Sequence, residues 1–435
     1  MTLVSSTAIE NTRDAARSHL KNRDLLLAEQ SYRRVLESTP GDLEASHFLA
    51  TQHLDRNDAA KAIALLSATR DRHPGDAATL HQLGTAHMLA GDYTLAAAEL
   101  GSALERAPNM FVARLRLAIS LENLGRGQSA LMSYLRAIND AQAQGRWLGN
   151  DTTAPGLREA VMYAMDYVDV GRRQLFDDLL QPLQRLYGAS EMSRVERCIS
   201  IYLNERSPEF PDPRQQPKFL YFPGIPSQPF YPRERFAWQS ALEASGAAIR
   251  DELREIMAQP GSLESFLQSG KREEADAFLK SSSDTAAAWD AYFFYRHGER
   301  YDAHCERCPA TSALLDRIPL VRIREHAPET LFSVLSPGTH ILPHRGVTNT
   351  RLVTHLPLIV PSDCALRVGG ETHVWQQDQC VTFDDTFEHE AWNRSTESRV
   401  VLIIDSWNPD LTEAECHAVT DLVAAIGDLN RDVAP

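Results

Sequence analysis

Apolar residues in the first third of the chain follow a helical spacing, and the helical pattern itself returns every 34 residues. Matched positions carry a small residue, a large apolar residue, an asparagine or glycine, and a proline. Such a period is typical of stacked helix–turn–helix units, because a small residue lets paired helices approach closely and Asn or Gly fits the tight turn. The sequence therefore predicts an α-solenoid over residues 10–140. The matched positions are Ala28, Ala62, Ala96 and Ala130; Tyr32, Leu66, Leu100 and Tyr134; Asn57, Gly91 and Gly125; and Pro40, Pro74 and Pro108.

The repeated unit resembles the tetratricopeptide repeat, whose solenoids usually present a concave surface to a peptide or protein. A dimerisation or scaffolding role is the alternative. Residues 141–206 remain helical in pattern without a clear period, so we expect a helical cap on the solenoid. Residues 207–232 contain eight prolines together with several aromatic residues. The prolines exclude a helix or a central strand, and the aromatic residues indicate that this connecting segment packs on a domain surface.

Beyond about residue 285 the pattern changes to short runs rich in Val, Ile, Thr and aromatic residues, separated by Gly, Pro and Asp. Several short strands at close spacing predict an antiparallel sandwich or barrel. Together with a helical stretch near 234–258, this region is predicted to form a domain over 233–412, followed by a helical tail at 413–435. The predicted fold class is α+β and multidomain, and 435 residues suit about three structural units.

Charge and composition exclude several classes of protein. Lysine and arginine number 44 against 59 for aspartate and glutamate, a net charge of −15 that gives no general attraction to nucleic acid or to an anionic membrane. No apolar run approaches the roughly 20 residues of a membrane helix, and the first residues lack the pattern of a secretory signal. Six cysteines in so long a chain do not indicate a disulfide framework. We therefore expect a cytoplasmic protein that binds neither nucleic acid nor membrane.

Histidine and arginine residues mark the ends of three predicted strands. His344 and His389 stand at strand ends where they can converge at the mouth of a barrel, and Arg399 opens the last strong strand. A buried arginine beside histidines suits a carboxylate ligand, since its planar fork binds one bidentately. Arg351 and His355 share one face of another strand and add polar groups to the same interior. A non-haem iron(II) oxygenase requires this arrangement, whereas ordinary hydrogen-bonded histidines are the alternative.

Two long segments of the β region carry a family resemblance. The stretches SVLSPGTHILPHRGVTNTRLVTHLPLIVP and FDDTFEHEAWNRSTESRVVLIIDSWNPDL resemble the catalytic domain of the aspartyl/asparaginyl β-hydroxylases. These enzymes are 2-oxoglutarate- and iron(II)-dependent dioxygenases with a double-stranded β-helix (jelly-roll) fold. The resemblance covers roughly residues 215–412 and is dense through 331–410. Family enzymes with helical repeats ahead of the catalytic domain match the predicted architecture.

The resemblance implies a role for each candidate residue. His344 and His389 match the two metal-binding histidines. Gly346 falls where most 2-oxoglutarate oxygenases carry a carboxylate ligand. This family typically lacks that carboxylate, and water completes the coordination of the metal. For 2-oxoglutarate, Arg399 matches the arginine that binds a carboxylate, Ser333 is the expected hydroxyl partner and His355 matches a histidine at the other end of the molecule. Arg351 is a candidate contact for substrate or cosubstrate.

The implied reaction consumes O2 and 2-oxoglutarate, releases succinate and CO2, and hydroxylates the β-carbon of an aspartyl or asparaginyl residue in a peptide or protein. The helical repeats would then serve as a surface where that substrate docks. Animal members of the family show Arg-x-Arg-x-His, whereas this chain has Val353 at the second arginine. Because this arginine is replaced, the same reaction on a carrier-bound amino acid or on a lipid acyl chain is an alternative. A non-catalytic scaffold is the alternative from another class.

Two other groups of residues are alternatives for metal binding. Asp384 or Asp385, shortly before His389, could supply a third metal ligand, although aspartates in such a turn often bond the backbone. Cys305 and Cys308 form a lone C-x-x-C, which lacks the second pair of ligands that a structural zinc site needs.

Overall fold

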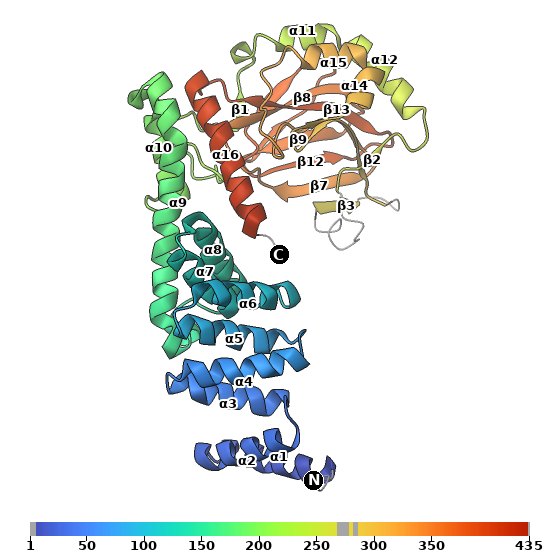
Figure 1. Ribbon diagram of the computed structural model, residues 1–435. Coiled ribbons are helices and arrows are strands. Elements are labelled where there is room, and N and C mark those ends of the chain that lie inside the picture. Colours follow the sequence, from blue (N-terminus) through green and yellow to red (C-terminus); the bar gives the residue numbers. More distant parts are fainter. Residues whose placement is uncertain (1–5, 268–277, 282–285, 434–435) are drawn as a thin grey trace. The chain divides into compact units, whose positions relative to one another are not determined.

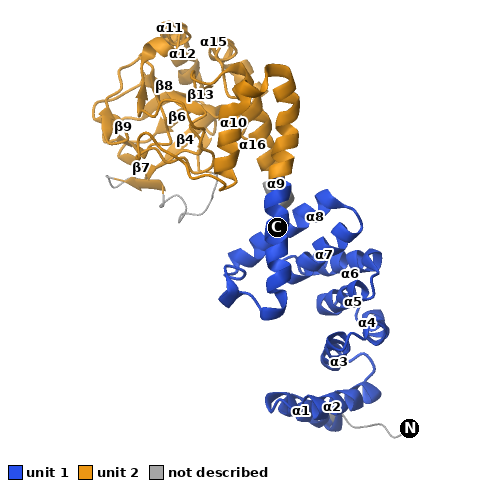
Figure 2. Ribbon diagram, turned by 90° about the vertical axis from the view of Figure 1, so that its left-hand side faces the viewer, with its two compact units in different colours: residues 1–172, 429–435 blue, residues 173–428 orange. Residues whose placement is uncertain are grey.

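The computed structural model describes residues 6–267, 278–281 and 286–433 of the chain. It forms two compact units, coloured separately in Figure 2: residues 1–172 with 429–435, and residues 173–428. The length predicted about three units. The structure has two units, and the boundary between them falls inside one long helix, α9 (Arg158–Tyr187). The helices that follow the repeats are therefore divided between the two units and do not form a third.

The first unit consists of paired helices in the predicted order. Each pair is a helical hairpin, and the predicted prolines stand two residues beyond the ends of α2, α4 and α6. The helices are α1 (Ser6–Lys21), α2 (Leu25–Ser38), α3 (Leu43–Asp55), α4 (Ala59–Arg72), α5 (Ala77–Leu89), α6 (Tyr93–Arg106), α7 (Phe111–Asn123) and α8 (Gly127–Ala143), followed by the short turns η1 (Asn150–Thr152) and η2 (Pro155–Leu157).

The positions that define the 34-residue period have the structural roles that the pattern predicted. The four matched alanines are fully buried, and so are the four large residues that follow them by four positions. Each hairpin therefore buries the same pair of one small and one large side chain. Asn57, Gly91 and Gly125 adopt positive φ angles of 59°, 78° and 70°, the left-handed conformation that such a turn needs. Arg23 takes the same conformation one period earlier, with φ of 62°.

Aspartates cap the repeat helices, a second periodic feature that the sequence analysis missed. Asp24, Asp58 and Asp92, each 34 residues apart, accept a hydrogen bond from the backbone N–H three residues on at the start of α2, α4 and α6. Asp42 and Asp76 do the same for α3 and α5. Each cap satisfies one of the free N–H groups of a helix start.

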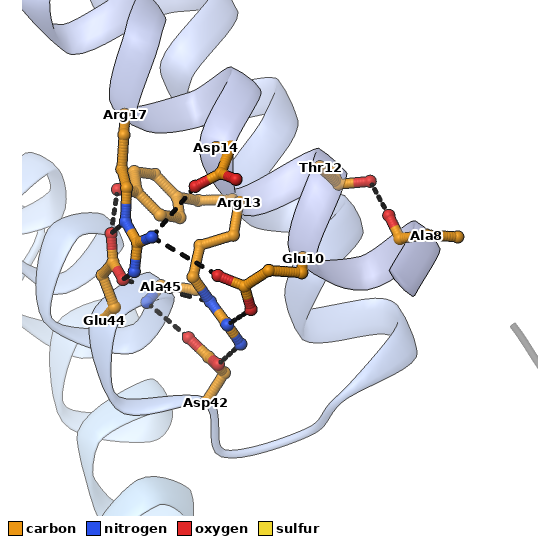
Figure 3. A network of polar contacts seen from close by, with 10 residues as sticks. Ala8, Glu10, Thr12, Arg13, Asp14, Arg17, Asp42, Glu44 and Ala45 are labelled. Atoms are coloured by element: carbon orange, nitrogen blue, oxygen red, sulfur yellow. Dashed lines mark hydrogen bonds and ion pairs between the residues drawn. The ribbon is translucent and has the colours of Figure 1, made fainter. Parts of the chain in front are cut away.

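Ion pairs connect the first hairpin to the next one, as Figure 3 shows. Arg17 Nη2 lies 2.6 Å from a carboxylate oxygen of Glu44, and Arg13 Nη2 lies 2.7 Å from Asp42. Tyr32 donates its hydroxyl to Glu44 at 2.7 Å. Polar contacts therefore supplement the apolar contacts between α1 and α3.

The second unit contains two β-sheets among the described residues. An eight-stranded sheet has the order β1-β11-β8-β13-β6-β4-β2 with β5 paired to β4, and a five-stranded sheet has the order β10-β9-β12-β7-β3. The strands are β1 (Phe230–Tyr231), β2 (Glu264–Ser265), β3 (Leu279–Ser281), β4 (Trp289–Arg296), β5 (Glu299–Arg300), β6 (Thr330–Leu335), β7 (Thr339–His344), β8 (Arg351–Ile359), β9 (Cys364–Val368), β10 (Glu371–His373), β11 (Val381–Phe383), β12 (His389–Asn393) and β13 (Arg399–Trp407).

The alternation of side chains along the strands gives the eight-stranded sheet two apolar faces. Leu335, Val353 and Val401 pack against Ile341 and Leu366 of the other sheet in one core cluster. The opposite face packs on helices, visible above the strands in Figure 1. These helices are α11 (Gln239–Ala244), α12 (Gly246–Met257), α14 (Asp302–Arg307) and α15 (Pro309–Leu315).

The proline-rich connecting segment packs on the β domain, as its aromatic residues predicted. Phe222 is fully buried, and its backbone N–H donates to the Asn349 side chain at 2.8 Å. The short turn η3 (Ala189–Met192) and helix α10 (Ser193–Tyr202) precede this segment, and η4 (Arg233–Arg235) follows it. Helix α16 (Glu413–Val433) pairs with α10 through Arg194 and Glu415. The last two residues of the predicted tail lie outside the described residues.

All six cysteines have free thiols, including Cys305 and Cys308, which are buried. Within the described ranges, no helix combines the length and apolar character that crossing a membrane requires.

The aspartate caps lead to a stability prediction. Asp92→Ala removes the acceptor for the Leu95 N–H, so we expect the free energy of unfolding to fall by about 1 kcal/mol. Urea denaturation followed by circular dichroism measures the change. Asp71→Ala is the matched control, because Asp71 makes only an exposed ion pair with Arg70 and should change stability by less than about 0.5 kcal/mol. Equal effects from both variants would contradict the capping role.

Candidate active site

Two histidines face each other across neighbouring strands of the five-stranded sheet. His389 on β12 is the direct register partner of His344 on β7, and the ring centroids lie 4.1 Å apart. His344 Nδ1 donates to the Leu342 carbonyl at 2.8 Å, and His389 Nδ1 donates to the Phe387 carbonyl at 3.1 Å. Because each Nδ1 carries the proton, each Nε2 keeps a free lone pair. The pair therefore has the tautomer that metal ligation through Nε2 requires.

Burial keeps both imidazoles uncharged at neutral pH. Desolvation lowers the pKa of His389 to about 4, with the neighbouring His344 adding to the shift. Desolvation also lowers the pKa of His344, against a hydrogen bond to the backbone and the charge of Asp385 that act to raise it. Neutral imidazoles compete for a metal ion without first losing a proton.

Asp385 occupies the space beside this pair that a side chain at position 346 would need. A Cβ built on Gly346 would overlap the Asp385 carboxyl group, and the Gly346 N–H donates to the Asp385 carbonyl at 2.6 Å. A side chain at 346 would therefore have to move the Asp385 carboxyl group, which is ion-paired with Arg351. Of the two aspartates considered as a third ligand, only Asp385 lines the cavity described below. Asp384 instead accepts hydrogen bonds from Gln215 at 2.6 Å and from Thr386.

Arg399 is a buried cation for which the described residues provide no hydrogen-bonded counter-ion. It is 1% exposed, and its Nε and Nη1 groups have no hydrogen-bond partner in the described structure. Its guanidinium lies over the Trp375 ring, 4.9 Å from the centroid. Desolvation lowers the pKa of Arg399 to about 10, which still leaves it charged at neutral pH. A buried guanidinium with unpaired N–H groups is suited to binding an anion, and a carboxylate fits its fork.

Ser333 and His355 extend the polar end of the site around Arg399. Ser333 Oγ accepts a hydrogen bond from the Trp289 indole N–H at 2.9 Å, which leaves the serine O–H free to donate. His355 Nδ1 is buried without a partner among the described residues. Burial and the nearby Arg399 lower the pKa of His355 well below its ordinary value, so its ring is neutral.

One cavity of about 150 Å³ connects all these groups. It lies between the two sheets, and its apolar wall includes Val353, Phe383 and Ile403. All six residues singled out in the sequence line it: His344, His389, Arg399, Ser333, His355 and Arg351.

Arg351 differs from Arg399 because its charge is already neutralised. Its Nη1 donates to Asp405 and its Nη2 to Asp385, both at 2.9 Å. All three side chains are largely buried, and the two carboxylates raise the pKa of Arg351 against the cost of burial. The sequence analysis expected Arg351 to contact substrate or cosubstrate. In the structure, two of its N–H groups donate hydrogen bonds to protein carboxylates instead.

The sequence analysis assigned no role to three cavity residues that can form polar contacts, Trp289, Glu329 and Asp405. Trp289, which orients Ser333, opens a strand whose existence was predicted. Glu329 precedes β6 and shares its inward face with Leu331 and Ser333, so the two-residue alternation contained the signal. Asp405 lies six residues after Arg399 on β13, so the same alternation places it on the inward face.

A third protein ligand is absent from the site as far as the structure is described. No group of three or more His, Cys, Asp or Glu side chains in those residues has a geometry suited to a metal ion. His340 is engaged elsewhere, 2.6 Å from Glu390.

Comparison with known families assigns both parts of the chain. Residues 243–409 match the Aspartyl/Asparaginyl beta-hydroxylase family, and residues 13–77 and 81–145 match the Tetratricopeptide repeat. The chain therefore carries an aspartyl/asparaginyl β-hydroxylase domain behind tetratricopeptide repeats, which confirms both resemblances found in the sequence.

Three curated relatives illustrate the breadth of the family. "Aspartate beta-hydroxylase domain-containing protein 2" of Xenopus tropicalis is 30% identical over 56% of this chain and 64% of its own length. The human "Aspartyl/asparaginyl beta-hydroxylase" is 32% identical over 43% of this chain and 24% of its own. The "Ornithine lipid ester-linked acyl 2-hydroxylase" of Rhizobium tropici is 32% identical over 44% of this chain and 64% of its own. The chain thus spans less than two thirds of each of these three proteins.

The buried ion cluster leads to a second stability prediction. Arg351→Met leaves Asp385 and Asp405 buried without their cation, so we expect the free energy of unfolding to fall by about 3–5 kcal/mol. Arg351→Met combined with Asp405→Asn should recover part of this loss, because one uncompensated charge is removed. Denaturant unfolding of the purified variants gives both values. Arg254→Ala, which breaks an exposed ion pair with Asp251, is the control and should cost less than about 1 kcal/mol. A loss for Arg351→Met as small as the control's would contradict the role of the cluster.

Proposed function

We propose that the β domain is a 2-oxoglutarate- and iron(II)-dependent dioxygenase that hydroxylates an unactivated carbon. The observation that carries this proposal is the convergence, in one buried cavity, of two neutral imidazoles with free Nε2 atoms and an arginine with unpaired N–H groups. The family match supports hydroxylation as the reaction class.

His344 and His389 would hold iron(II) through Nε2, with water completing the coordination. Imidazole suits ferrous iron, and a site with few protein ligands leaves positions open for cosubstrate and oxygen. Bound iron would supply the activation of O2 that allows attack on an unactivated C–H bond. Asp385 stands beside the histidines, where its carboxylate can accept hydrogen bonds from that water.

Arg399 would bind the distal carboxylate of 2-oxoglutarate. Its Nε and Nη1 are buried without partners and can donate together to one carboxylate. Ser333 would add its hydroxyl hydrogen, and His355 would contact the other end of the cosubstrate. Burial of these groups keeps competing water away from the bound molecule.

The two sheets are proposed to form a double-stranded β-helix. Their shared core and the placement of the histidine pair on one sheet and Arg399 on the other support this fold. It positions a metal centre and a cosubstrate anchor on opposing walls of one cavity.

The expected substrate is a peptide or protein, with the β-carbon of aspartate or asparagine as the target. The tetratricopeptide repeats would provide the docking surface, since such solenoids commonly bind peptides. A lipid acyl chain is the second candidate, favoured by Val353 and the other apolar residues of the cavity wall. The name of the Rhizobium tropici relative, an acyl 2-hydroxylase, points the same way.

The first experiment measures succinate formed from 2-oxoglutarate by the purified full chain with iron(II), ascorbate and air, without added substrate. We expect slow turnover that falls at least tenfold in His344→Ala and in His389→Ala, because each variant loses one of two protein ligands. His340→Ala, whose ring pairs with Glu390, is the matched control and should keep wild-type turnover. Wild-type protein that neither turns over nor binds 2-oxoglutarate would favour the non-catalytic scaffold.

The second experiment measures 2-oxoglutarate binding by calorimetry under nitrogen. Arg399→Met removes the buried cation, so we expect the dissociation constant to rise by about 30-fold or more, as typical for a charge-assisted contact. Arg394→Met is the control, since that exposed arginine lies over Trp392. Unchanged affinity in Arg399→Met would remove this arginine from the cosubstrate site.

A further inference from the structure

Three successive first helices of the repeat pairs, α3, α5 and α7, are joined by polar side chains. Gln82 of α5 donates to the Thr51 hydroxyl of α3 at 3.2 Å, and Arg116 of α7 donates to the Thr85 hydroxyl of α5 at 2.9 Å. Gln82 and Arg116 are 34 residues apart, and so are Thr51 and Thr85. Matched positions of stacked repeats lie on one face of a solenoid. These four side chains and His81 therefore form one surface, which we call the polar row.

Arg116 is held in a fixed position within the polar row. Its Nη1 donates to His81 Nε2 at 2.6 Å as well as to Thr85, whose hydroxyl donates in turn to the His81 carbonyl at 2.8 Å. Because an arginine can only donate, His81 accepts through Nε2 and carries its proton on Nδ1. Burial, followed by the charge of Arg116, lowers the pKa of His81 to about 4, so this ring is neutral. Both hydrogen-bond partners of Arg116 are therefore uncharged.

The described residues supply no carboxylate that neutralises Arg116. Burial lowers the pKa of Arg116, and no described carboxylate acts to raise it. Arg114, on the same helix, is by contrast paired with Asp140 at 3.2 Å. Glu122 stands six residues after Arg116, about 9 Å along the helix at 1.5 Å per residue, and accepts the Tyr134 hydroxyl at 2.7 Å. Arg116 is thus a locally uncompensated positive charge.

One edge of the Arg116 guanidinium remains available to a ligand. Nη1 makes both of the hydrogen bonds described above, and Nε and Nη2 have no partner in the described part of the chain. The side chain is half-buried, and neither of these two atoms is enclosed by protein. The Nε and Nη2 edge of a guanidinium matches the two oxygens of a carboxylate.

The surroundings of Arg116 suit a residue in the middle of a peptide. Its guanidinium bonds to α5, the middle helix of the three, so a segment lying across the row continues on both sides of it. Packed helices lie 8–10 Å apart, and three of them span roughly 20 Å, the length of about six extended residues. Gln82 and Thr51 offer uncharged polar groups to a peptide backbone, and Leu89, 42% exposed on α5, offers apolar surface.

We propose that the polar row binds an acidic segment of a protein partner, with Arg116 bonded to an aspartyl or glutamyl side chain. This inference rests on the proposed function, because it names the chemistry of the substrate that the repeats would dock. Charge complementarity carries it. The whole chain has a net charge of −15, so an acidic segment is attracted where a cation lacks a protein counter-ion, as at Arg116.

The test measures peptide binding to the full chain, without added metal, by fluorescence anisotropy. The acidic probe is a labelled, acetylated and amidated peptide, Ala-Ser-Glu-Glu-Ile-Glu-Ser-Ala, and the neutral probe has glutamine in place of each glutamate. Glutamate is chosen because the proposed hydroxylation targets aspartate or asparagine. We expect the acidic probe to bind about tenfold more tightly than the neutral probe. Equal binding of both probes would overturn the proposal, and so would an acidic probe that does not bind below about 1 mM.

Variants of Arg116 separate its charge from the fold. Arg116→Met removes the cation and both free donors, so we expect it to weaken binding of the acidic probe about tenfold. Arg126→Met is the matched control, because it removes an exposed arginine outside the polar row and changes the net charge equally. Arg116→Lys keeps the charge without the fork and should retain part of the affinity. Wild-type affinity in Arg116→Met, shown to be folded by circular dichroism, would exclude Arg116 as the contact.

Two further measurements identify the source of the carboxylate. The neutral probe is also made with a free C-terminus, and tighter binding of this form than of the amidated acidic probe would assign the row to a chain end and reject the proposal. Sedimentation of the full chain tests a second copy as the occupant. A wild-type dimer that Arg116→Met dissociates would likewise reject an acidic partner segment.

The proposed function can fail independently of this inference. Succinate formation without peptide tests the hydroxylase chemistry alone, whereas anisotropy with metal-free protein tests the docking alone. Wild-type turnover without a preference for the acidic probe would keep the enzyme and reject the acidic segment. An acidic preference that depends on Arg116, in protein without turnover, would keep the docking surface and reject the chemistry.

Discussion

The antiparallel pairing of β7 with β12 is the constraint on which the rest of the active site depends. This register sets His389 directly opposite His344, and the backbone carbonyls two residues earlier fix the orientation of both rings. A shift by one residue would turn one imidazole to the other face of the sheet. The shared core between the sheets then holds the histidine pair across the cavity from Arg399. The geometry of the candidate site thus follows from strand register more than from any loop.

The two buried arginines of the cavity show how the same residue type can serve two purposes. Arg399 is held by packing against an aromatic ring and keeps unpaired N–H groups, which suits it to binding an anion. Arg351 has its anions supplied by the protein, and it joins strands β8 and β13 to the turn before β12. One arginine is organised for a ligand and the other for the shape and charge of the wall. Sequence position alone does not distinguish them.

Periodic and alternating features were predictable from the sequence, and long-range partners were not. The 34-residue period predicted the buried alanines and the left-handed turns because each repeat is a local unit. Strand alternation, together with the family resemblance, predicted which histidines and which arginine point inward. The partners of Arg351 stand 34 and 54 residues away in sequence, so only the strand order reveals them. The jelly-roll topology, the bound cofactors and the substrate remain predictions.

The position of the Asp385 carboxyl group against Gly346 couples three positions of the chain to one another. A Cβ built on Gly346 would lie 2.1 Å from the Asp385 carboxyl carbon, so any side chain there would have to move the aspartate. Moving or removing the aspartate would leave Arg351 with a single partner and unbalance a buried ion cluster. The effect of a substitution at any one of these positions therefore depends on the residues at the other two.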